Sequence, residues 1–296
     1  MRRKNDQIAF HLMMAPGMIF LIIFSFIPMF GIIMAFQNYM PARGILRSPW
    51  VGLDNFRFMF QIPDSKQIFI NTIVIAIGKI ILGTIVSVGF ALLLNEIRVR
   101  CVKKTIQTIV YLPNFLSWVI LATVVVNLFS YEGPINSLLF LFGIDPILFM
   151  ASNTWFRPML VVTDVWKSFG YGSIIYLASL TSIDQGLYEA ATMDGANRFK
   201  RMIHITIPGL LPTIMLVTAM NLPNILNAGF DQIFNLYNPL VMQTSDIIDT
   251  YVYRVGLVGR QYSLGTAVGL MRSVVGIILM LSANKIAQKT TDYRLF

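Results

Sequence analysis

The sequence predicts an all-α membrane protein with six transmembrane helices, and three observations lead to this fold class. Of its 296 residues, 56% are hydrophobic and only 12% are charged, whereas a soluble domain carries about 25% charged residues. Apolar stretches long enough to cross a bilayer, about 20 residues each, recur along the chain. Basic residues gather in the short polar loops between those stretches.

Six stretches qualify as membrane spans: 12–36, 68–95, 106–130, 155–180, 207–229 and 262–287. Several contain Pro or Gly, such as Pro16 and Pro28 in the first, which membrane helices tolerate better than soluble helices do. The first stretch follows Arg2, Arg3 and Lys4, and it is longer than the roughly 7–15 apolar residues of a signal peptide. No small-residue cleavage site follows it. We therefore expect an uncleaved first membrane helix.

The positions of the basic residues predict the orientation. With the N-terminus inside, the cytoplasmic segments carry most of the 23 Lys and Arg. These residues are Arg2, Arg3, Lys4, Arg98, Arg100, Lys103, Lys104, Arg198, Lys200, Arg201, Lys285, Lys289 and Arg294. Because Lys and Arg accumulate in cytoplasmic loops, both termini are predicted to lie in the cytoplasm.

Composition argues against several other functions. Cys101 is the only cysteine, so no internal disulfide can form. His11 and His204 are the only histidines and lie far apart, which argues against a zinc cluster and a histidine-based catalytic site. The net charge of +9 is spread between apolar runs rather than gathered in one basic patch, so nucleic acid is not an expected partner.

The domain organisation is predicted to be simple. No break in composition marks a separate folded unit, and a single domain is expected over 1–296. Its core is expected at 68–287. The first membrane helix at 12–36 and an outer segment at 37–67, too polar to span, precede that core.

One inner loop, 182–208, reads SIDQGLYEAATMDGANRFKRMIHITIP and is too polar for the membrane. Ser182 with Gln185 can form a capping box for a short amphipathic helix. Gly195 can end that helix, and a second short helical stretch is expected over 196–203. Pro208 falls near the start of the next span, where a first-turn proline costs little.

This loop resembles the cytoplasmic pattern of type I ABC importer permeases: Glu-Ala-Ala, three residues, Gly, nine residues, then Ile-x-Leu-Pro. Here Glu189-Ala190-Ala191 is followed at that spacing by Gly195 and then by Ile205-Thr206-Ile207-Pro208. The departure is Ile207 in place of Leu. The stretches 51–56, 166–167, 188–191 and 194–196 resemble the carbohydrate-uptake branch. That resemblance covers roughly 10–290 and is closest to oligosaccharide permeases of the lipoprotein-linked and polygalacturonan/rhamnogalacturonan type.

The resemblance implies a division of labour. The loop would be a coupling helix that docks on a cytoplasmic ATPase, through Glu189, Ala190, Ala191, Asp194, Gly195, Ile205 and Pro208. The expected partners are two copies of that ATPase, a second permease subunit and a solute-binding protein. The chain lacks the Gly-x-x-x-x-Gly-Lys-Ser/Thr phosphate loop. It is therefore not expected to be an enzyme or to bind a cofactor, and ATP and Mg are expected on the ATPase. The resemblance implies that the chain lies in the bacterial cytoplasmic membrane.

Polar residues inside the spans are the candidates for a substrate path, because intramembrane charges usually face a cavity or the bundle interior. They are Asp164, Lys167, Asn224, Asn227 and Arg272, together with Asp231 just beyond the fifth span. Lys79 is a further charge in the second span. Asp164 and Lys167 are three residues apart on one helix face and can pair with each other, so a path role and a purely structural pair are both open.

Three alternatives remain at this stage. The chain could be an ABC importer permease for a solute other than a sugar. It could be a secondary transporter driven by protons or sodium, which leaves the loop pattern unexplained. A membrane enzyme is the third, although no nucleophile with a base and no metal-ligand set stands out.

Overall fold

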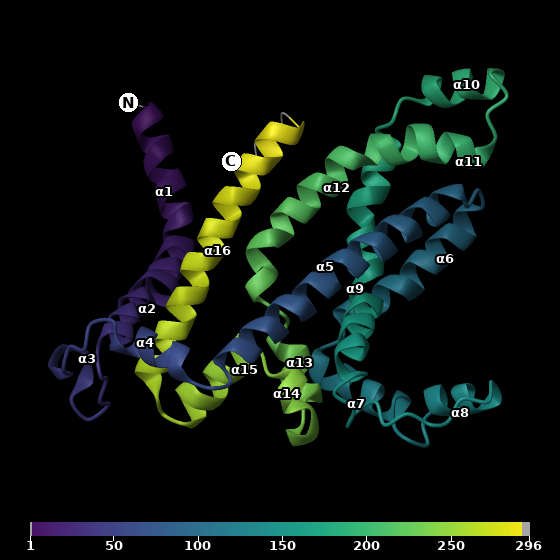
Figure 1. Cartoon of the computed structure of the whole chain (residues 1–296). Coiled ribbons are helices and arrows are strands. Elements are labelled where there is room, and N and C mark those ends of the chain that lie inside the picture. The colour runs from purple at the N-terminus through teal and green to yellow at the C-terminus, as the bar shows by residue number, and fades with distance from the viewer. Residues whose placement is uncertain (1, 292–296) are drawn as a thin grey trace. The chain divides into compact units, whose positions relative to one another are not determined.

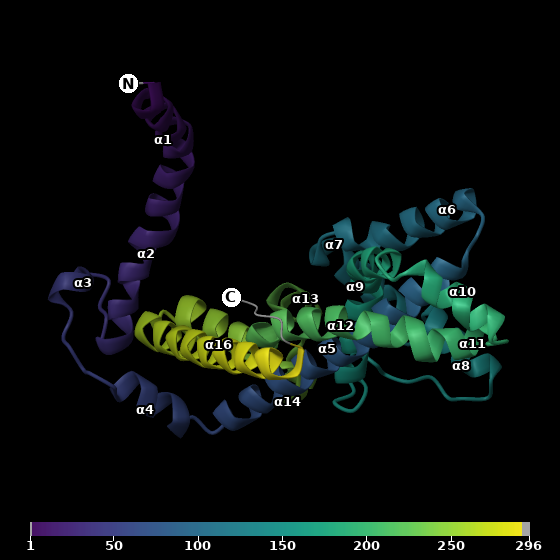
Figure 2. The same cartoon turned by 90° about the horizontal axis from the view of Figure 1, so that it is seen from above.

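The structure, a computed structural model, describes the backbone of residues 2–291 and the side chains of residues 10–222, 225–282 and 284–285. Figures 1 and 2 give two views of it. Within these residues the regular secondary structure is helical, and the one extended pairing is an isolated bridge between Gln37 and Trp50. The prediction of an all-α protein is confirmed.

The α-helices follow the chain in the order labelled in Figure 1. Their bounds are α1 Arg2–Leu21, α2 Ile27–Met29, α3 Gly44–Arg47, α4 Asp54–Gln61, α5 Ser65–Glu96, α6 Arg100–Tyr111, α7 Trp118–Leu128, α8 Pro134–Leu141, α9 Phe156–Thr181, α10 Gln185–Met193, α11 Arg198–Arg201, α12 Ile207–Asn221, α13 Phe230–Leu236, α14 Met242–Ser245, α15 Ile248–Tyr251 and α16 Tyr262–Thr291. Short 3₁₀ or π turns join several of them without a break in the helical path.

Four helical stretches of the described chain are long and apolar enough to cross a membrane: Phe10–Phe36, Ser65–Glu96, Arg198–Asn221 and Tyr262–Ser282. A fifth is present if the pair Arg100–Phe115 and Trp118–Leu128 forms one span. The 26 residues of α9 match the predicted span 155–180 in length. Asp164 and Lys167 lower the mean hydropathy of α9, and the count of six stays a prediction.

The stretch 106–130, predicted as one span, consists of two helices that meet at a sharp angle. The helix bends by 104° between Phe115 and Trp118. Leu112–Phe115 is a 3₁₀ turn that contains Pro113, and a proline removes one backbone donor from the helix. Ser117 then caps α7 by accepting a hydrogen bond from the amide of Ile120.

Backbone contacts divide the chain into two compact units, which are described separately. One consists of residues 66–250 and 274–296. Within it, α9 packs against α6 and α12, and α13 packs against α7. Its main core joins apolar side chains of α5, α7, α9 and the segment from 228 to 247. Ile75, Leu160 and Ile233 at the centre of this core are fully buried.

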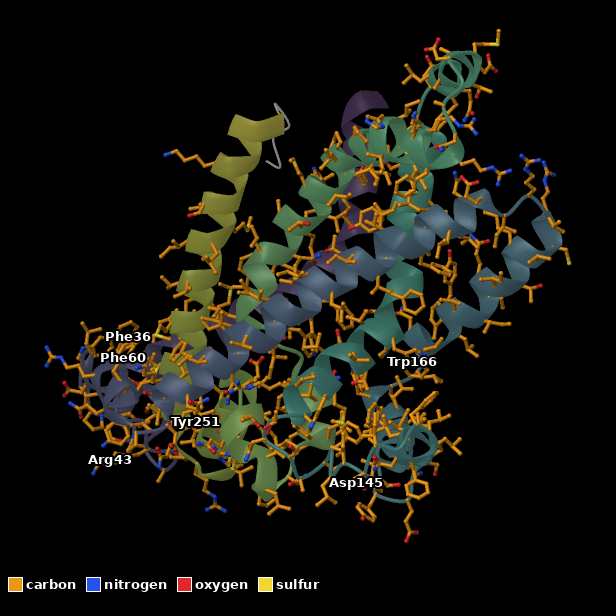
Figure 3. The ribbon with its side chains drawn as sticks, turned by 45° about the vertical axis from the view of Figure 1, so that its right-hand side comes forward. Phe36, Arg43, Phe60, Asp145, Trp166 and Tyr251 are labelled. Carbon is orange, nitrogen blue, oxygen red and sulfur yellow. The ribbon has the colours of Figure 1, made fainter. Side chains whose placement is uncertain are left out.

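The other unit consists of residues 1–65 and 251–273. Phe36 stacks on Trp50 with ring centroids 5.7 Å apart, and Asn55 donates hydrogen bonds to the carbonyls of Ala35 and Gln37 at 2.8 and 3.0 Å. These contacts give the predicted outer segment 37–67 a fixed fold. Figure 3 labels Phe36, Arg43 and Phe60 in this unit. The prediction of a single domain over 1–296 stays a prediction.

The close approach of α6 and α9 depends on the absence of a side chain at Gly170. A Cβ built there would lie 2.5 Å from the carbonyl oxygen of Val110, whereas a Cβ at Gly89 of α5 would meet nothing within 4 Å. Backbone cannot yield as a flexible side chain can. Gly170 therefore lies at a tight helix contact, and Gly89 offers a control position in open space.

We expect Gly170→Ala to destabilise the purified protein by about 1–3 kcal/mol through overpacking. Gly89→Ala should leave the melting temperature unchanged or raise it slightly, because Ala favours helix over Gly. Thermal unfolding in detergent measures both variants. Equal melting temperatures for the two variants would contradict the proposed contact.

Candidate functional site

The side chain of Lys79, in the middle of α5, links three segments of its unit. Its ammonium group forms an ion pair with Asp164 of α9 at 3.2 Å. It also donates a hydrogen bond to the carbonyl of Ala228 at 2.7 Å and another to the side chain of Gln232 in α13. Only 11% of the Lys79 side chain is exposed, against 27% of that of Asp164. The charge is therefore nearly enclosed while its counter-ion reaches open space.

Gln232 extends this network into the core and is itself fully buried. Its amide nitrogen donates to the carbonyl of Leu160 at 2.8 Å and to the hydroxyl of Thr163 at 2.9 Å. The Thr163 hydroxyl donates in turn to the carbonyl of Met159 at 2.7 Å. A buried polar group without partners is costly, and here each donor and acceptor of the Gln232 amide is used. The amide therefore has one orientation.

The helical path breaks directly beside Lys79, at residues 227–229. Gly229 has a φ of +94°, and a Cβ there would lie 2.8 Å from the Lys79 ammonium nitrogen. The left-handed φ favours glycine at this position, and a side chain there would also displace the Lys79 ammonium group. The break leaves carbonyls without helical partners, and Lys79 satisfies that of Ala228. Within a membrane, irregular backbone is tolerated where such partners or a cavity exist.

Two cavities adjoin this site and share Lys79, Ile80, Asp164 and Asn221 among their lining residues. One measures about 290 Å³ and runs along α5 and α9, and the other measures about 170 Å³ and reaches the break. The larger is also lined by the polar residues Thr84, Ser87, Ser168 and Tyr176, and the smaller by Asn227. Hydroxyl, amide and carboxylate groups therefore surround a space within the helical unit.

The structure brings together two of the six path residues predicted from sequence, Asp164 and Asn227. The pairing of Asp164 with Lys167, which helical spacing left open, does not occur, because Asp164 pairs with Lys79. Lys167 instead donates to the carbonyls of Asn114 and Leu116 at 3.0 and 2.8 Å. These carbonyls lie at the sharp bend between α6 and α7, whose free acceptors attract the ammonium group.

The other predicted path residues lie elsewhere. Asp231 is exposed in the first turn of α13. Arg272 is half-buried in α16 and belongs to the other unit. The side chain of Asn224 is outside the described residues. Sequence reasoning noted Lys79 as an intramembrane charge but missed Gln232 and Gly229, since a neutral amide and a glycine give no signal without knowledge of their neighbours.

The inner loop forms two short helices, α10 and α11, as predicted. Its N-cap is Asp184, whose carboxylate accepts from the amide of Gly186 at 2.9 Å, and not Ser182. Gly195 has a φ of +75°. The amide of Gly195 bonds to the carbonyl of Thr192, and that of Ala196 to the carbonyl of Ala191. This pair of backbone hydrogen bonds is a Schellman motif, which ends a helix at a glycine in the left-handed conformation.

Side chains then hold the two short helices together. The hydroxyls of Tyr188 and Thr206 lie 3.0 Å apart, and Arg201 donates to the hydroxyl of Thr192 at 2.9 Å. Pro208 lies at the start of α12, as predicted. The residues 182–208 therefore form a preformed hairpin.

No residue of α10 is buried within the described chain. Leu187 is 53% exposed and Met193 is 89% exposed, although both are apolar. Glu189, Ala190 and Asp194 are exposed as well, while Ala191 and Ile205 are half-buried. In Figure 1 the helix stands apart at the end of its unit, and in Figure 3 its side chains project freely.

Comparison with known proteins identifies the kind of chain that carries these features. Residues 83–292 match the sequence profile of a family described as the binding-protein-dependent transport system inner membrane component. The chain belongs to this family. The matched residues include the cavity-lining part of α9, the break at 227–229 and the whole hairpin. The predicted membership among these permeases is confirmed.

Two relatives are similar over nearly their whole lengths. Protein LplB of Bacillus subtilis (strain 168) is 42% identical over 97% of this chain and 90% of its own length. The polygalacturonan/rhamnogalacturonan transport system permease protein YteP of the same organism is 40% identical over 94% of this chain and 87% of its own length.

Chains of solved ABC transporter structures share the fold. A chain of a bacterial ABC transporter involved in the import of the acidic polysaccharide alginate superposes with a TM-score of 0.88. It is 37% identical, and the match covers 97% of both chains. A second structure of a bacterial alginate ABC transporter, in complex with an alginate pentasaccharide-bound periplasmic protein, also gives 0.88, at 36% identity. The helical arrangement is thus that of an importer's membrane subunit.

We expect Lys79→Met to lower the stability of the permease by up to about 3 kcal/mol, because removal of one partner leaves a poorly solvated charge unpaired. Adding Asp164→Asn to Lys79→Met should recover part of the loss, since no net charge then remains. Thermal unfolding in detergent measures these effects. Lys66→Met, at an exposed position of the same helix, is the matched control and should have little effect.

If the double variant were no more stable than Lys79→Met alone, the ion pair with Asp164 would not be what holds this site together.

Proposed function

We propose that this chain is the membrane-spanning permease subunit of an ABC importer that moves oligosaccharides into the cell. In this proposal it crosses the cytoplasmic membrane six times as one domain over 1–296, with both termini in the cytoplasm. It forms half of a translocation path and receives force from a separate ATPase.

The observation that carries the proposal is the preformed, unburied hairpin of α10 and α11. Exposed apolar residues on a rigid, capped helix are typical of a surface that docks on another protein. Ala190 and Ala191 keep the helix thin, so that a partner can approach closely. Glu189 can form a charge-assisted hydrogen bond with a basic group of that partner. Gly195 sets the turn without steric strain.

The hairpin also has a direct connection to the cavities. The helical path from Arg198 to Asn221 is continuous over 24 residues. Its first turn belongs to the hairpin, and its last residue, Asn221, lines both cavities. A displacement of the hairpin by an ATPase would therefore move the cavity wall. We propose that this movement is transmitted through the coupling residues Glu189, Ala190, Ala191, Asp194, Gly195, Ile205 and Pro208.

The proposed cargo is a carbohydrate. The similar permease YteP carries a polygalacturonan/rhamnogalacturonan transport name, and the similar solved transporters import alginate. The groups around the cavities suit hydroxyl-rich molecules, because amides, hydroxyls and the partly exposed carboxylate of Asp164 can all hydrogen-bond to sugar hydroxyls. Asp164 and Asn227 are the proposed path residues that line the cavities. Lys167, Asn224, Asp231 and Arg272 remain further proposals.

The proposed partners follow from this division of labour. They are a second permease subunit, two copies of a cytoplasmic ATPase that hold ATP and Mg, and an extracellular or periplasmic solute-binding protein. The alginate transporter bound to its periplasmic protein supports the last of these by analogy.

Reconstitution of the complete transporter in proteoliposomes tests the proposed function. We expect uptake of labelled pectin- or alginate-derived oligosaccharides that requires both ATP and the loaded binding protein. Labelled peptides, amino acids and phosphate should not be transported. Uptake by the permease without the ATPase, driven by a proton or sodium gradient, would refute the importer mechanism. ATP-dependent uptake of a non-sugar alone would refute only the cargo.

We expect Glu189→Lys to reduce uptake by at least about tenfold, the effect of losing one charge-assisted contact. Gly195→Asp should also reduce uptake, because a side chain strains the left-handed turn at this position. In both variants ATP hydrolysis by the assembled complex should lose its response to the binding protein. Glu132→Lys and Gly143→Asp are matched controls. Glu132 is likewise exposed, and Gly143 has the same φ of +75° in open space, outside the hairpin. Normal coupling in both hairpin variants would refute the coupling role.

A further inference from the structure

A third cavity of about 440 Å³ lies between the ends of α5 and α9 and the hairpin. Its walls are of two kinds. Leu92, Leu93, Leu180 and Met202 form an apolar side, and the remainder is polar or charged. That remainder consists of Asn95, Glu96, Arg98, Thr181, Gln185, Tyr188, Arg198, Arg201 and Thr206. The cavity is amphipathic, with leucines beside guanidinium groups.

The charges of this cavity are unbalanced. Three arginines face one carboxylate, that of Glu96. Arg198 lies 3.7 Å from Glu96, and Arg201 donates to Thr192. Among the described residues the side chain of Arg98 forms neither an ion pair nor a hydrogen bond. The cavity therefore has positive charge and free donors that no group of the described chain uses.

We propose that this cavity binds the phosphate of an anionic lipid headgroup. The helices α5 and α9 end at its rim, at Glu96 and Thr181, and membrane helices end at the bilayer surface. Guanidinium groups match phosphate oxygens in charge and in planar geometry. The leucines beside them suit the glycerol backbone and the first methylenes of the acyl chains. Basic pockets between membrane helices at this depth are suited to anionic lipids.

The site is separate from the proposed docking surface and from the cargo path. None of the seven proposed coupling residues lines it, and neither Lys79 nor Asp164 does. It nevertheless contacts the hairpin through Gln185, Tyr188 and Arg201. A bound headgroup would therefore join the base of the hairpin to the ends of two membrane helices, and it leaves the outer face of α10 to the ATPase.

Lipid binding to the assembled transporter tests the proposal. Native mass spectrometry would be used to titrate the complex with dihexanoylphosphatidylglycerol, with zwitterionic dihexanoylphosphatidylcholine and with inorganic phosphate. We expect the anionic lipid to bind most tightly. Arg98→Gln should weaken its binding roughly tenfold, as expected for one lost charge-assisted hydrogen bond. Arg98→Lys should give an intermediate loss, because an ammonium lacks the planar fork. Arg98 has no side-chain partner to lose, so folding is not at risk.

Lys104→Gln is the matched control, since it removes one exposed positive charge from the neighbouring helix α6 without touching the cavity. It should leave lipid binding unchanged. Equal loss in Arg98→Gln and Lys104→Gln would overturn the site in favour of general surface charge. Equal binding of the zwitterionic lipid, or no lipid binding to the complete complex, would also overturn it. Binding of inorganic phosphate that is as tight as that of the lipid and is weakened by Arg98→Gln would assign the arginines to a free phosphate and overturn the lipid.

Discussion

A lysine in the middle of an apolar helix constrains the arrangement of the helices around it. The ammonium group of Lys79 cannot remain in such surroundings without partners, because an uncompensated charge in low dielectric is costly. It finds them in Asp164, Gln232 and the carbonyl of Ala228, which come from two separate stretches of the chain, α9 and residues 228–232. These stretches meet at one point, and the left-handed φ of Gly229 lets the chain turn there.

The same interaction leaves a polar space within an otherwise apolar bundle. Lys79 uses one side of the Asp164 carboxylate, and the rest of that group faces a cavity with hydroxyls and amides on its walls. An intramembrane charge pair can serve structure alone. Here the pair also lines the cavity that we propose as part of the substrate path, so in that proposal stability and transport depend on the same atoms.

The hairpin of α10 and α11, unlike the site around Lys79, is held together by local contacts. Its helices are held by their own caps, by the Schellman motif at Gly195 and by two side-chain hydrogen bonds. Packing against the rest of its unit contributes little, because no residue of α10 is buried. A surface that keeps its shape without being buried suits the docking role proposed for it, and the continuous helix from Arg198 to Asn221 connects it to the cavities.

The sequence by itself determined the all-α membrane class, the family through the pattern from Glu189 to Pro208, and the helix end at Gly195. These are local properties, since apolar run length and short-range spacing suffice to read them. Tertiary structure decided the partner of Asp164, the role of Lys167 at the bend between α6 and α7, and the place of Gln232. Residues far apart in the chain meet in these contacts. Helical spacing allowed a pair between Asp164 and Lys167, but Asp164 instead compensates the enclosed charge of Lys79, 85 residues away in sequence.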